Sequence, residues 1–450
     1  MSHLSVAKFG GTSVANYPAM QSCANIVIAD PNTRVVVLSA SAGITNLLVA
    51  LANGCEEPER NKLLNEVRQI QENILTELKD DSRVRPKIEA LLANITSLAE
   101  AANLATSLAL TDELISHGEM MSSLIFVEVL RELQIEATWL DVRTIVATNS
   151  HFGKAAPNDE QTRQNCDNLL KPLIERGELV ITQGFIGRDE QGKTTTLGRG
   201  GSDYSAALLA EVLNAQDVLI WTDVAGIYTT DPRIVSNAQR IDTMSFSEAA
   251  EMATFGAKVL HPATLLPAVR SNIPVYVGSS KAPQEGGTWV TRNPQPRPTF
   301  RAIALRRDQT LLTLSSLNML YAQGFLANIF TILAKHKISV DTITTSEVSV
   351  ALTLDKTGSA SSGASLLSEE LLRELSEFCT VKVDVGLSLI ALIGNELHTA
   401  SGVAKRIFET LDAYNIRMIS YGASTNNICL LADSDKADNI VRVLHRSLFE

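Results

Sequence analysis

The stretch TTLGRGGSDYSAALLAEVL, residues 195–213, decides most about this chain. Its glycines come first, the capping-type residues Ser202 and Asp203 follow, and a run of strong helix formers begins directly after them. This order predicts a helix whose N-terminal N–H groups face an anion, and Arg199 adds a planar fork suited to a carboxylate or a phosphate. We therefore expect an anion-binding turn at the start of this helix.

A second candidate for a phosphate site lies just upstream. Residues 187–194 read GRDEQGKT and match the P-loop pattern G-x-x-x-x-G-K-[ST]. A P-loop lysine opens a helix, whereas Lys193 is followed by threonines, which favour a strand. We interpret the polar tip of this segment as a β-hairpin turn and keep the P-loop as the alternative.

The N-terminal segment KFGGTSV, residues 8–14, has a similar design. Gly10 and Gly11 let the backbone approach a ligand closely, and Lys8 brings a positive charge. One glycine-rich turn alone is a common feature of proteins. Two such turns, each beside a basic residue, strengthen the prediction of a site for anionic ligands.

Strands and helices alternate along the first part of the chain. Strands are expected at residues 4–9, 34–40, 137–142, 178–186, 217–224 and 273–280, and helices at 41–54, 57–107 (two helices) and 111–133. Such alternation predicts a mainly parallel α/β sheet with helices on both faces. Prolines and glycines gather in residues 282–300, which we interpret as the linker that ends the first domain.

The C-terminal part of the chain contains an internal repeat. Residues 324–346 align without gaps to residues 402–424, with matching isoleucine, phenylalanine, leucine and serine positions. Each copy has the pattern of a helix, a strand and a second strand of alternating polarity, which predicts a duplicated βα domain. The strand-like segment 300–308 fits either copy, so its assignment stays open.

Composition and charge restrict the class of protein. The chain has 450 residues, 45% of them hydrophobic, and a net charge of −11, which argues against a nucleic-acid footprint. No apolar run approaches the ~20 residues of a membrane span, and the N-terminus lacks the layout of a signal peptide. The five cysteines are scattered without a C-x-x-C motif, so we expect reduced thiols in a cytoplasmic protein.

Six segments together resemble the aspartate kinases of the amino-acid kinase family: KFGGTS, LSASAGITN, SHGE, TTLGRGGSDYSA, WTDVAGIYTTDPR and FGAKVLHPAT. The resemblance covers the whole chain, and the C-terminal repeat looks like the paired ACT domains of those enzymes. The segments SEVSVALTLD and GFLA are similar to the lysine-sensitive, monofunctional members. Because no G-x-G-x-x-G dinucleotide fingerprint is present, a fused homoserine dehydrogenase is not expected.

The resemblance implies three domains. Residues 1–292 would form the amino-acid kinase fold, a mainly parallel sheet sandwiched by helices. Residues 300–385 would form a first, lysine-binding ACT domain, and residues 386–450 a second one, both of the ferredoxin-like βαββαβ type. Whether the two ACT domains are interleaved stays open at this point.

The implied reaction transfers the γ-phosphoryl group of ATP to the β-carboxylate of L-aspartate, giving 4-phospho-L-aspartate and ADP. It would begin the lysine, threonine and methionine branch of amino-acid biosynthesis. Because both substrates are anionic and a carboxylate is already nucleophilic, catalysis should consist of positioning and cationic clamping. The implied cofactor is Mg²⁺, held mainly by ATP oxygens and water, and no protein ligand is assigned to it.

The resemblance also implies the site residues. It assigns catalysis to Lys8, Asp203 and Lys258, aspartate binding to Ser39, Thr45, Glu119, Arg199, Gly200 and Ser202, and ATP binding to Lys8, Gly10, Gly11, Thr222, Asp223, Tyr228, Arg233 and Lys258. Lys8 would bridge the transferred and leaving oxygens, and Asp203 would orient Lys8. Glu119 would bind the α-ammonium of aspartate. The alternatives are helix capping for Asp203 and an internal salt bridge for Glu119.

The implied lysine site lies in the first ACT copy. A bound lysine needs an acid for its ammonium, and only the first copy has two, Asp341 and Glu347, whose repeat equivalents are Ile419 and Thr425. The predicted contacts are Met319, Gly324, Phe325, Leu326, Val340, Asp341, Ser346 and Glu347. The alternative is that both acids are solvated surface charges. Since ACT copies usually pair edge to edge, the resemblance implies a homodimer.

Two rival functions follow from the same residues. The first is an amino-acid sensor with an inactive kinase fold, which the intact Lys8, Arg199, Asp203 and Lys258 disfavour. The second is a kinase of the same fold that acts on glutamate, acetylglutamate, carbamate or UMP. The SHGE segment and the ACT pair disfavour that alternative.

Overall fold

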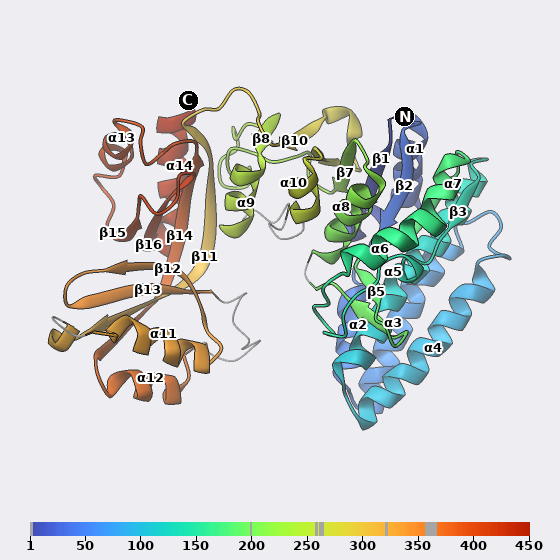
Figure 1. The fold of residues 1–450 in the computed structure, drawn as a ribbon, viewed down its shortest axis with the longest axis horizontal. Helices are drawn as coiled ribbons and strands as arrows, with labels where there is room; N and C mark the ends of the chain where they lie inside the picture. The colour runs from blue at the N-terminus through green and yellow to red at the C-terminus, as the bar shows by residue number, and fades with distance from the viewer. Residues whose placement is uncertain (1–2, 199, 257–259, 261–264, 320–322, 356–366) are drawn as a thin grey trace. The chain divides into compact units, whose positions relative to one another are not determined.

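The computed structural model describes residues 3–198, 200–256, 260, 265–319, 323–355 and 367–450. The chain divides into two compact units (Figure 1). The first unit contains Met1–Ile227, Arg240–Ala250 and Lys258–Gln295, and the second contains Tyr228–Gln239, Glu251–Ala257 and Pro296–Glu450. Among the described residues, no helix has both the length and the apolar character needed to cross a membrane.

An eight-stranded sheet forms the centre of the first unit, in the order β3-β4-β2-β1-β7-β9-β10-β8. The strands are β1 (Ser5–Phe9), β2 (Thr33–Leu38), β3 (Ala137–Trp139), β4 (Leu179–Gln183), β7 (Asp217–Thr222), β8 (Thr243–Ser245), β9 (Val275–Ser279) and β10 (Gly287–Thr291). All described neighbours run parallel except β9 and β10. The predicted mainly parallel sheet is therefore confirmed.

Helices cover both faces of this sheet (Figure 1). The helices of this part of the chain are α1 (Tyr17–Ala29), α2 (Ile44–Ala52), α3 (Glu57–Leu75), α4 (Arg85–Leu104), α5 (Leu108–Glu132), α6 (Asp159–Asn165), α7 (Lys171–Glu175), α8 (Gly201–Leu213), α9 (Phe246–Thr254) and α10 (Leu266–Ser271). Of these, α3 and α4 pack against α2 and α5, and the division between the two units falls within α9. Ala7 and Phe9 of β1 share a core with α1 and α5, whereas α8 packs on the other face. The pair of helices predicted within residues 57–107 is α3 and α4.

The segment GRDEQGKT forms a β-hairpin. Strands β5 (Ile186–Arg188) and β6 (Thr194–Thr196) pair antiparallel across it. The carboxylate of Asp189 accepts hydrogen bonds from the backbone N–H groups of Gln191 at 3.0 Å and Lys193 at 2.8 Å, which fixes the turn. The hairpin prediction is confirmed, and the P-loop alternative is wrong.

The segment 282–300 is only partly a linker, which corrects the prediction from sequence. Strand β10 lies within it and joins the sheet of the first unit beside β9. Its residues GTWVT are rich in β-branched and aromatic types, and the ring of Trp289 packs against Tyr276 of β9 with the ring centroids 5.1 Å apart. Only the proline-rich residues 292–299, between β10 and β11, contain no strand.

A six-stranded sheet, in the order β12-β13-β11-β14-β16-β15, dominates the second unit. Its strands are β11 (Phe300–Ser315), β12 (Ser339–Thr345), β13 (Ser349–Asp355), β14 (Thr380–Gly394), β15 (Ile416–Ser420) and β16 (Asn427–Asp433). Its helices are α11 (Phe325–Lys335), α12 (Glu369–Ser376), α13 (Val403–Thr410) and α14 (Ser434–Phe449).

Two long strands interleave the two copies of the repeat. Residues 300–306 of β11 pair with residues 389–394 of β14, which in turn pair with β16 of the second copy. Residues 311–315 of β11 pair instead with residues 380–384 of β14 and with β13 of the first copy. The segment 300–308 that the sequence left open therefore begins in the second copy, although it precedes the first copy along the chain.

The repeat is visible in matching details of the two copies. Gly324 and Gly402 begin α11 and α13 with φ angles of 84° and 80°, a conformation that glycine adopts without strain. Ile329 anchors the core of the first copy and its equivalent Ile407 that of the second.

Candidate active site

Lys8 and Asp203 form an ion pair in the first unit. Lys8 Nζ lies 2.6 Å from Asp203 Oδ1, and the two side chains are only 12% and 14% exposed. Lys8 stands near the carboxyl end of the parallel strand β1, and Asp203 stands in the first turn of α8. Ligands of open α/β sheets bind at this end of the strands, and helix N-termini attract anions. The predicted partnership of these two residues is therefore present in the structure.

The two glycines after Lys8 have different roles. A Cβ on Gly11 would lie 2.8 Å from the carbonyl oxygen of Ala40, so only glycine fits where this turn meets the loop after β2. A Cβ on Gly10 would meet its nearest atoms, Lys8 Nζ and the Trp221 carbonyl oxygen, at 3.7 Å. Gly10 thus leaves its space beside the lysine ammonium unfilled, and a phosphate oxygen could approach there.

The loop after β2 faces α5 with tight backbone packing. The carbonyl oxygen of Ser39 accepts a hydrogen bond of 2.8 Å from the hydroxyl of Ser122 in α5. A Cβ on Gly118 of α5 would lie 2.7 Å from the Cβ of Ala40. Thr45 is half-buried in the first turn of α2, which begins directly after this loop.

Glu119 is a buried carboxylic acid that lacks a full set of partners. Its side chain is 3% exposed, and its Oε2 atom has no hydrogen-bond partner among the described residues. Burial raises the pKa of Glu119 to about 8, although the backbone N–H of Ala40 and the charge of Lys8 act in the opposite direction. The part of the chain that the structure describes offers no ion pair for this carboxyl group, so the alternative of an internal salt bridge finds no support.

Sequence reasoning missed Ser41, whose hydroxyl is also buried without a partner among the described residues. It lies next to Ala40, which donates its N–H to Glu119. The repeated serine in SASAG could have pointed to it.

The N-terminus of α8 is held close to the turn after β4. Gly200 begins the helix with a φ of 75°, and a Cβ on Gly201 would lie 2.7 Å from Phe185 Cδ2. Ser202 is half-buried. A Cβ added at Gly184 would lie 2.6 Å from the Cβ of Ser202. Two predicted site residues, Arg199 and Lys258, lie outside the described residues.

The residues predicted to bind ATP fall in both units. Thr222 ends β7, and its hydroxyl donates to the carboxylate of Asp223 at 3.2 Å in the first unit. Tyr228 and Arg233 belong to the second unit, in the loop Tyr228–Gln239. Arg233 is an exposed side chain that pairs with Asp231 at 2.7 Å, and burial therefore does not hold it in place.

The predicted lysine contacts lie around α11 and β12 of the first ACT copy. Met319, Phe325 and Val340 pack in the core of this copy, whereas Leu326 is exposed. Gly324 precedes α11, and Ser346 and Glu347 form the exposed turn between β12 and β13. Asp341 is not a solvated surface charge, because its side chain is 10% exposed and its Oδ1 lies 3.0 Å from Nη1 of Arg306.

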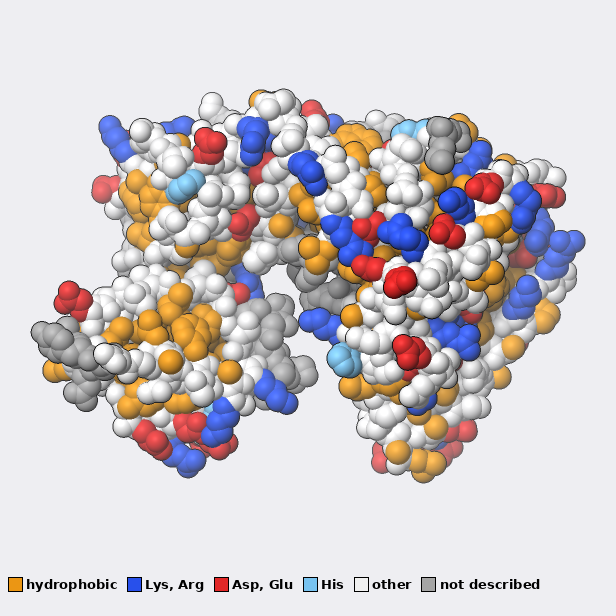
Figure 2. Space-filling model, viewed as in Figure 1, with side chains coloured by type: hydrophobic (Ala, Val, Ile, Leu, Met, Phe, Trp, Pro, Cys, Tyr) orange, Lys and Arg blue, Asp and Glu red, His pale blue; other side chains and the backbone are white. Residues whose placement is uncertain are grey.

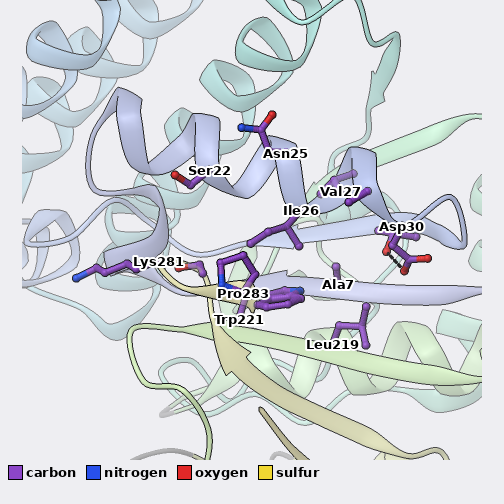
Figure 3. A pocket seen from close by; sticks show the side chains of 13 residues that line it. Ala7, Ser22, Asn25, Ile26, Val27, Asp30, Leu219, Trp221, Lys281 and Pro283 are labelled. Carbon is purple, nitrogen blue, oxygen red and sulfur yellow. Dashed lines mark hydrogen bonds between the residues drawn. The ribbon is translucent and has the colours of Figure 1, made fainter. Parts of the chain in front are cut away.

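A separate cavity of about 420 Å³ lies between α1 and the sheet (Figure 3). Ala7, Leu219 and Trp221 line its floor, and Lys281 and Pro283 line one side. Because side chains alternate along β1, Lys8 points to the face opposite Ala7. None of the predicted site residues lines this cavity, and we assign no function to it.

The fold and the site together define an amino-acid kinase with a C-terminal ACT region. The family model of the amino acid kinase family matches residues 3–279, and a model of the ACT domain matches residues 390–448. The chain is 62% identical to the lysine-sensitive aspartokinase 3 of Escherichia coli (strain K12) over 100% of both chains. It is 35% identical to the chloroplastic aspartokinase 3 of Arabidopsis thaliana, over 99% of this chain and 81% of the relative. The chain therefore belongs to the aspartokinases.

Two solved structures of E. coli aspartokinase III match all of the chain at 61% identity. One is the complex with aspartate and ADP in the R-state, with a TM-score of 0.89, and the other the complex with lysine and aspartate in the T-state, with a TM-score of 0.87. The prediction of an aspartate kinase is thus confirmed, and the rivals of an inactive sensor and of another kinase of this fold are rejected.

Proposed function

We propose that this aspartokinase transfers the γ-phosphoryl group of ATP to the β-carboxylate of L-aspartate and that L-lysine inhibits it through the first ACT copy. One observation carries the proposal for the chemistry. The charge pair of Lys8 and Asp203 stands at the N-terminus of α8, in the same unit as a buried glutamate with an unpartnered oxygen. The E. coli relative binds aspartate with ADP and also lysine, which supports the same ligands for this chain.

Lys8 acts on the phosphoryl group in this proposal. Its ammonium neutralises charge on the transferred and leaving oxygens as the transition state forms. Asp203 forms an ion pair with that ammonium and thereby fixes its position. The N–H groups at the start of α8 add positive potential for the carboxylate of aspartate. Lys258 and Arg199 complete the set of cations in this proposal.

Glu119 recognises the α-ammonium of aspartate in this proposal. A buried carboxyl group with an unpartnered oxygen is costly unless a cation or a donor meets it. The ammonium of the substrate is such a cation. Ser39, Thr45, Gly200 and Ser202 supply the remaining polar contacts.

ATP-using kinases require a divalent metal, and we propose Mg²⁺ for this one. Among the residues that the structure describes, no three His, Cys, Asp or Glu side chains form a metal-binding group. The carboxylate of Asp203 already pairs with Lys8. In this proposal the ion would be held mostly by phosphate oxygens and water, and it would neutralise charge on the β- and γ-phosphates.

Lysine binding is proposed for the start of α11 and the end of β12. The N–H groups after Gly324 suit the carboxylate of a bound lysine, and Asp341 and Glu347 suit its side-chain ammonium. Because Arg306 already pairs with Asp341, lysine must share or replace that partner. This exchange is a local change that lysine could transmit to the rest of the second unit.

A homodimer through the ACT region is also proposed. Hydrophobic side chains gather on the surface of the second unit over β12, β13 and α11 (Figure 2). Leu326 and Phe330 of α11 and Ile343 of β12 are exposed hydrophobic residues of this region. Apolar patches of this kind mark interaction surfaces.

The proposed domains are the kinase domain at 1–292 and the ACT copies at 300–385 and 386–450, with residues 300–306 completing the second copy. A cytoplasmic location is proposed because all five cysteines are free thiols.

The proposed substrate is tested by ADP release with L-aspartate, L-glutamate or N-acetyl-L-glutamate as acceptor. We expect turnover with L-aspartate and less than about one hundredth of that rate with the other two, because a longer side chain moves the acceptor carboxylate, and a misplacement of about 1 Å at the reacting atoms can cost about a hundredfold. Comparable rates with either analogue would contradict the proposal.

A further inference from the structure

Asp112 of α5 is a buried carboxylate that the proposed chemistry does not use. Its side chain is 1% exposed, and no ion pair with it is found in the described part of the chain. Burial raises the pKa of Asp112, although hydrogen bonds from Gly153 and Thr196 act in the opposite direction. Because a buried acid is costly unless donors meet it, these donors indicate which segments Asp112 holds together.

Thr196, the last residue of β6, makes two contacts with this carboxylate. Its backbone N–H donates to Oδ2 at 2.8 Å, and its hydroxyl donates to Oδ1 at 2.8 Å. The glycine-rich turn follows directly, and α8 begins at Gly201. Asp112 therefore fixes the point at which the chain enters this turn.

The loop around Gly153 meets the same carboxylate and the same turn. The backbone N–H of Gly153 donates to both carboxylate oxygens, at 3.0 Å to Oδ1 and 2.8 Å to Oδ2. The N–H of Ala155 donates to the carbonyl oxygen of Thr196 at 2.8 Å. A Cβ on Gly198 would lie 3.3 Å from the carbonyl oxygen of Gly153, so the loop lies against the turn itself. Asp112 thus joins α5, β6 and this loop beside the turn.

The helix α5 carries Asp112 and Glu119 on the same side, because two helical turns separate them. Glu119 is proposed to bind the α-ammonium of aspartate, whereas Gly200 and Ser202 at the start of α8 are proposed to contact the same small molecule. The spacing between these two elements must therefore match the length of one amino acid. The hydrogen bonds of Asp112 connect α5 directly to the segment that leads into α8.

We propose that Asp112 is a positioning residue for aspartate, which holds the glycine-rich turn before α8 at a fixed distance from Glu119. The inference rests on the proposed function in one respect, that Glu119 and the start of α8 bind aspartate. All the segments that Asp112 joins belong to the first unit. The residues proposed to bind ATP in this unit lie at other strands, at the carboxyl ends of β1 and β7. Loss of Asp112 therefore acts on aspartate more than on the nucleotide.

Asp189 provides a matched control, a buried acid with a purely structural set of contacts. Its side chain is 6% exposed, and it accepts hydrogen bonds from the backbone N–H groups of Gln191 and Lys193 and from the hydroxyl of Ser150. It lies in the turn of the β5–β6 hairpin, at the end away from Thr196. Asp112 and Asp189 thus resemble each other in burial and donors, and only Asp112 borders the glycine-rich turn.

The test compares Asp112→Asn, Asp189→Asn and Thr196→Val in the full chain. Asparagine keeps the shape of the side chain but replaces one acceptor by a donor, which then faces the N–H groups that met the carboxylate. We expect Asp112→Asn to lower kcat/KM for aspartate at saturating ATP at least about tenfold, because a misplacement of about 1 Å at the reacting atoms can cost about a hundredfold. Kd for MgADP, measured by calorimetry, should stay within about twofold. Asp189→Asn should leave both values within about twofold.

Thr196→Val loses only the hydroxyl contact and keeps the backbone N–H, so it reports even if Asp112→Asn does not fold. Its kcat/KM for aspartate should fall at least about threefold. Three outcomes would overturn the inference: an unchanged kcat/KM for aspartate in Asp112→Asn or in Thr196→Val, an equal loss of affinity for MgADP, or the same loss of kcat/KM in Asp189→Asn. A failure of the proposed aspartate chemistry would appear separately, as an absence of aspartate-dependent ADP release by the unmodified chain.

Discussion

At the scale of single residues, the account depends on two groups in the first unit, the ammonium of Lys8 and the buried carboxyl group of Glu119. Lys8 is held by Asp203 at 2.6 Å, and Glu119 is buried with an oxygen that has no described partner. The first arrangement keeps a cation ready for phosphate. In the second, the buried carboxyl group of Glu119 carries a free-energy cost of desolvation, and this cost falls when a cationic ligand binds.

Removal of the ammonium of Lys8 should abolish most of the turnover. Lys8→Ala is expected to lower kcat about a hundred- to a thousandfold, because a preorganised charge at the transferring group contributes at this level. Steady-state kinetics with ATP and aspartate measure the effect, and Lys62→Ala on the exposed face of α3 is the control. A loss of less than about threefold in a folded Lys8→Ala protein would contradict the assigned role.

The raised pKa of Glu119 makes the stability of the unliganded protein depend on pH. Its pKa is about 8 in the folded state against the ordinary 4.5 of a glutamate side chain, so between these two pH values the folded state holds a proton that the unfolded state has lost. Stability therefore falls as pH rises through this window, and the full cost is present above about pH 8.

Glu119→Gln removes the titrating group, so this contribution should disappear. Thermal unfolding of the unliganded proteins at pH 6 and pH 8.5 checks it, and the unmodified chain should lose more stability between the two pH values than the variant. Parallel profiles for the two proteins would show that Glu119 does not titrate in this range.

At the scale of elements, the two glycines after β1 should have different roles: Gly11 is needed for packing, and Gly10 for ligand access. Gly11→Ala would place a Cβ 2.8 Å from the carbonyl oxygen of Ala40, whereas Gly10→Ala meets nothing closer than 3.7 Å. We expect Gly11→Ala to lower the thermal midpoint by several degrees and Gly10→Ala to leave it nearly unchanged.

Gly10→Ala should instead raise KM for ATP, because its Cβ would take up space beside the ammonium of Lys8. Calorimetric unfolding and ATP titration of both variants measure the two effects. If both variants lost stability equally, the distinction between the two glycines would be wrong.

The elements also show what the sequence could predict. The β-branched run after Lys193 favoured a hairpin over a P-loop, and the alternating pattern predicted the parallel sheet, because both signals are local. Strand β10 was missed because glycines and prolines surround its five residues. The sharing of β11 between the ACT copies could not be predicted, since either copy could pair with it and only tertiary contacts decide. The same holds for the hydrogen bonds between Asp112 and Thr196, which lie 84 residues apart in sequence.

At the scale of the whole molecule, regulation should depend on the acids of the first ACT copy. Glu347→Gln is expected to raise the lysine concentration for half-inhibition at least about tenfold with kcat unchanged, because one charge partner of the ligand is lost. Glu409→Gln, on the exposed face of α13, is the matched control. Inhibition curves at fixed ATP and aspartate measure the shift, and coinciding curves for the two variants would reject Glu347 as a lysine contact.

The most direct test of the central claim is ATP-dependent formation of an acyl phosphate from L-aspartate, trapped with hydroxylamine, with and without millimolar lysine. The account predicts a hydroxamate product that requires both ATP and aspartate and that decreases strongly when lysine, but not threonine, is added. Absence of product from aspartate would contradict the proposed chemistry, and product that is insensitive to lysine would contradict the proposed regulation.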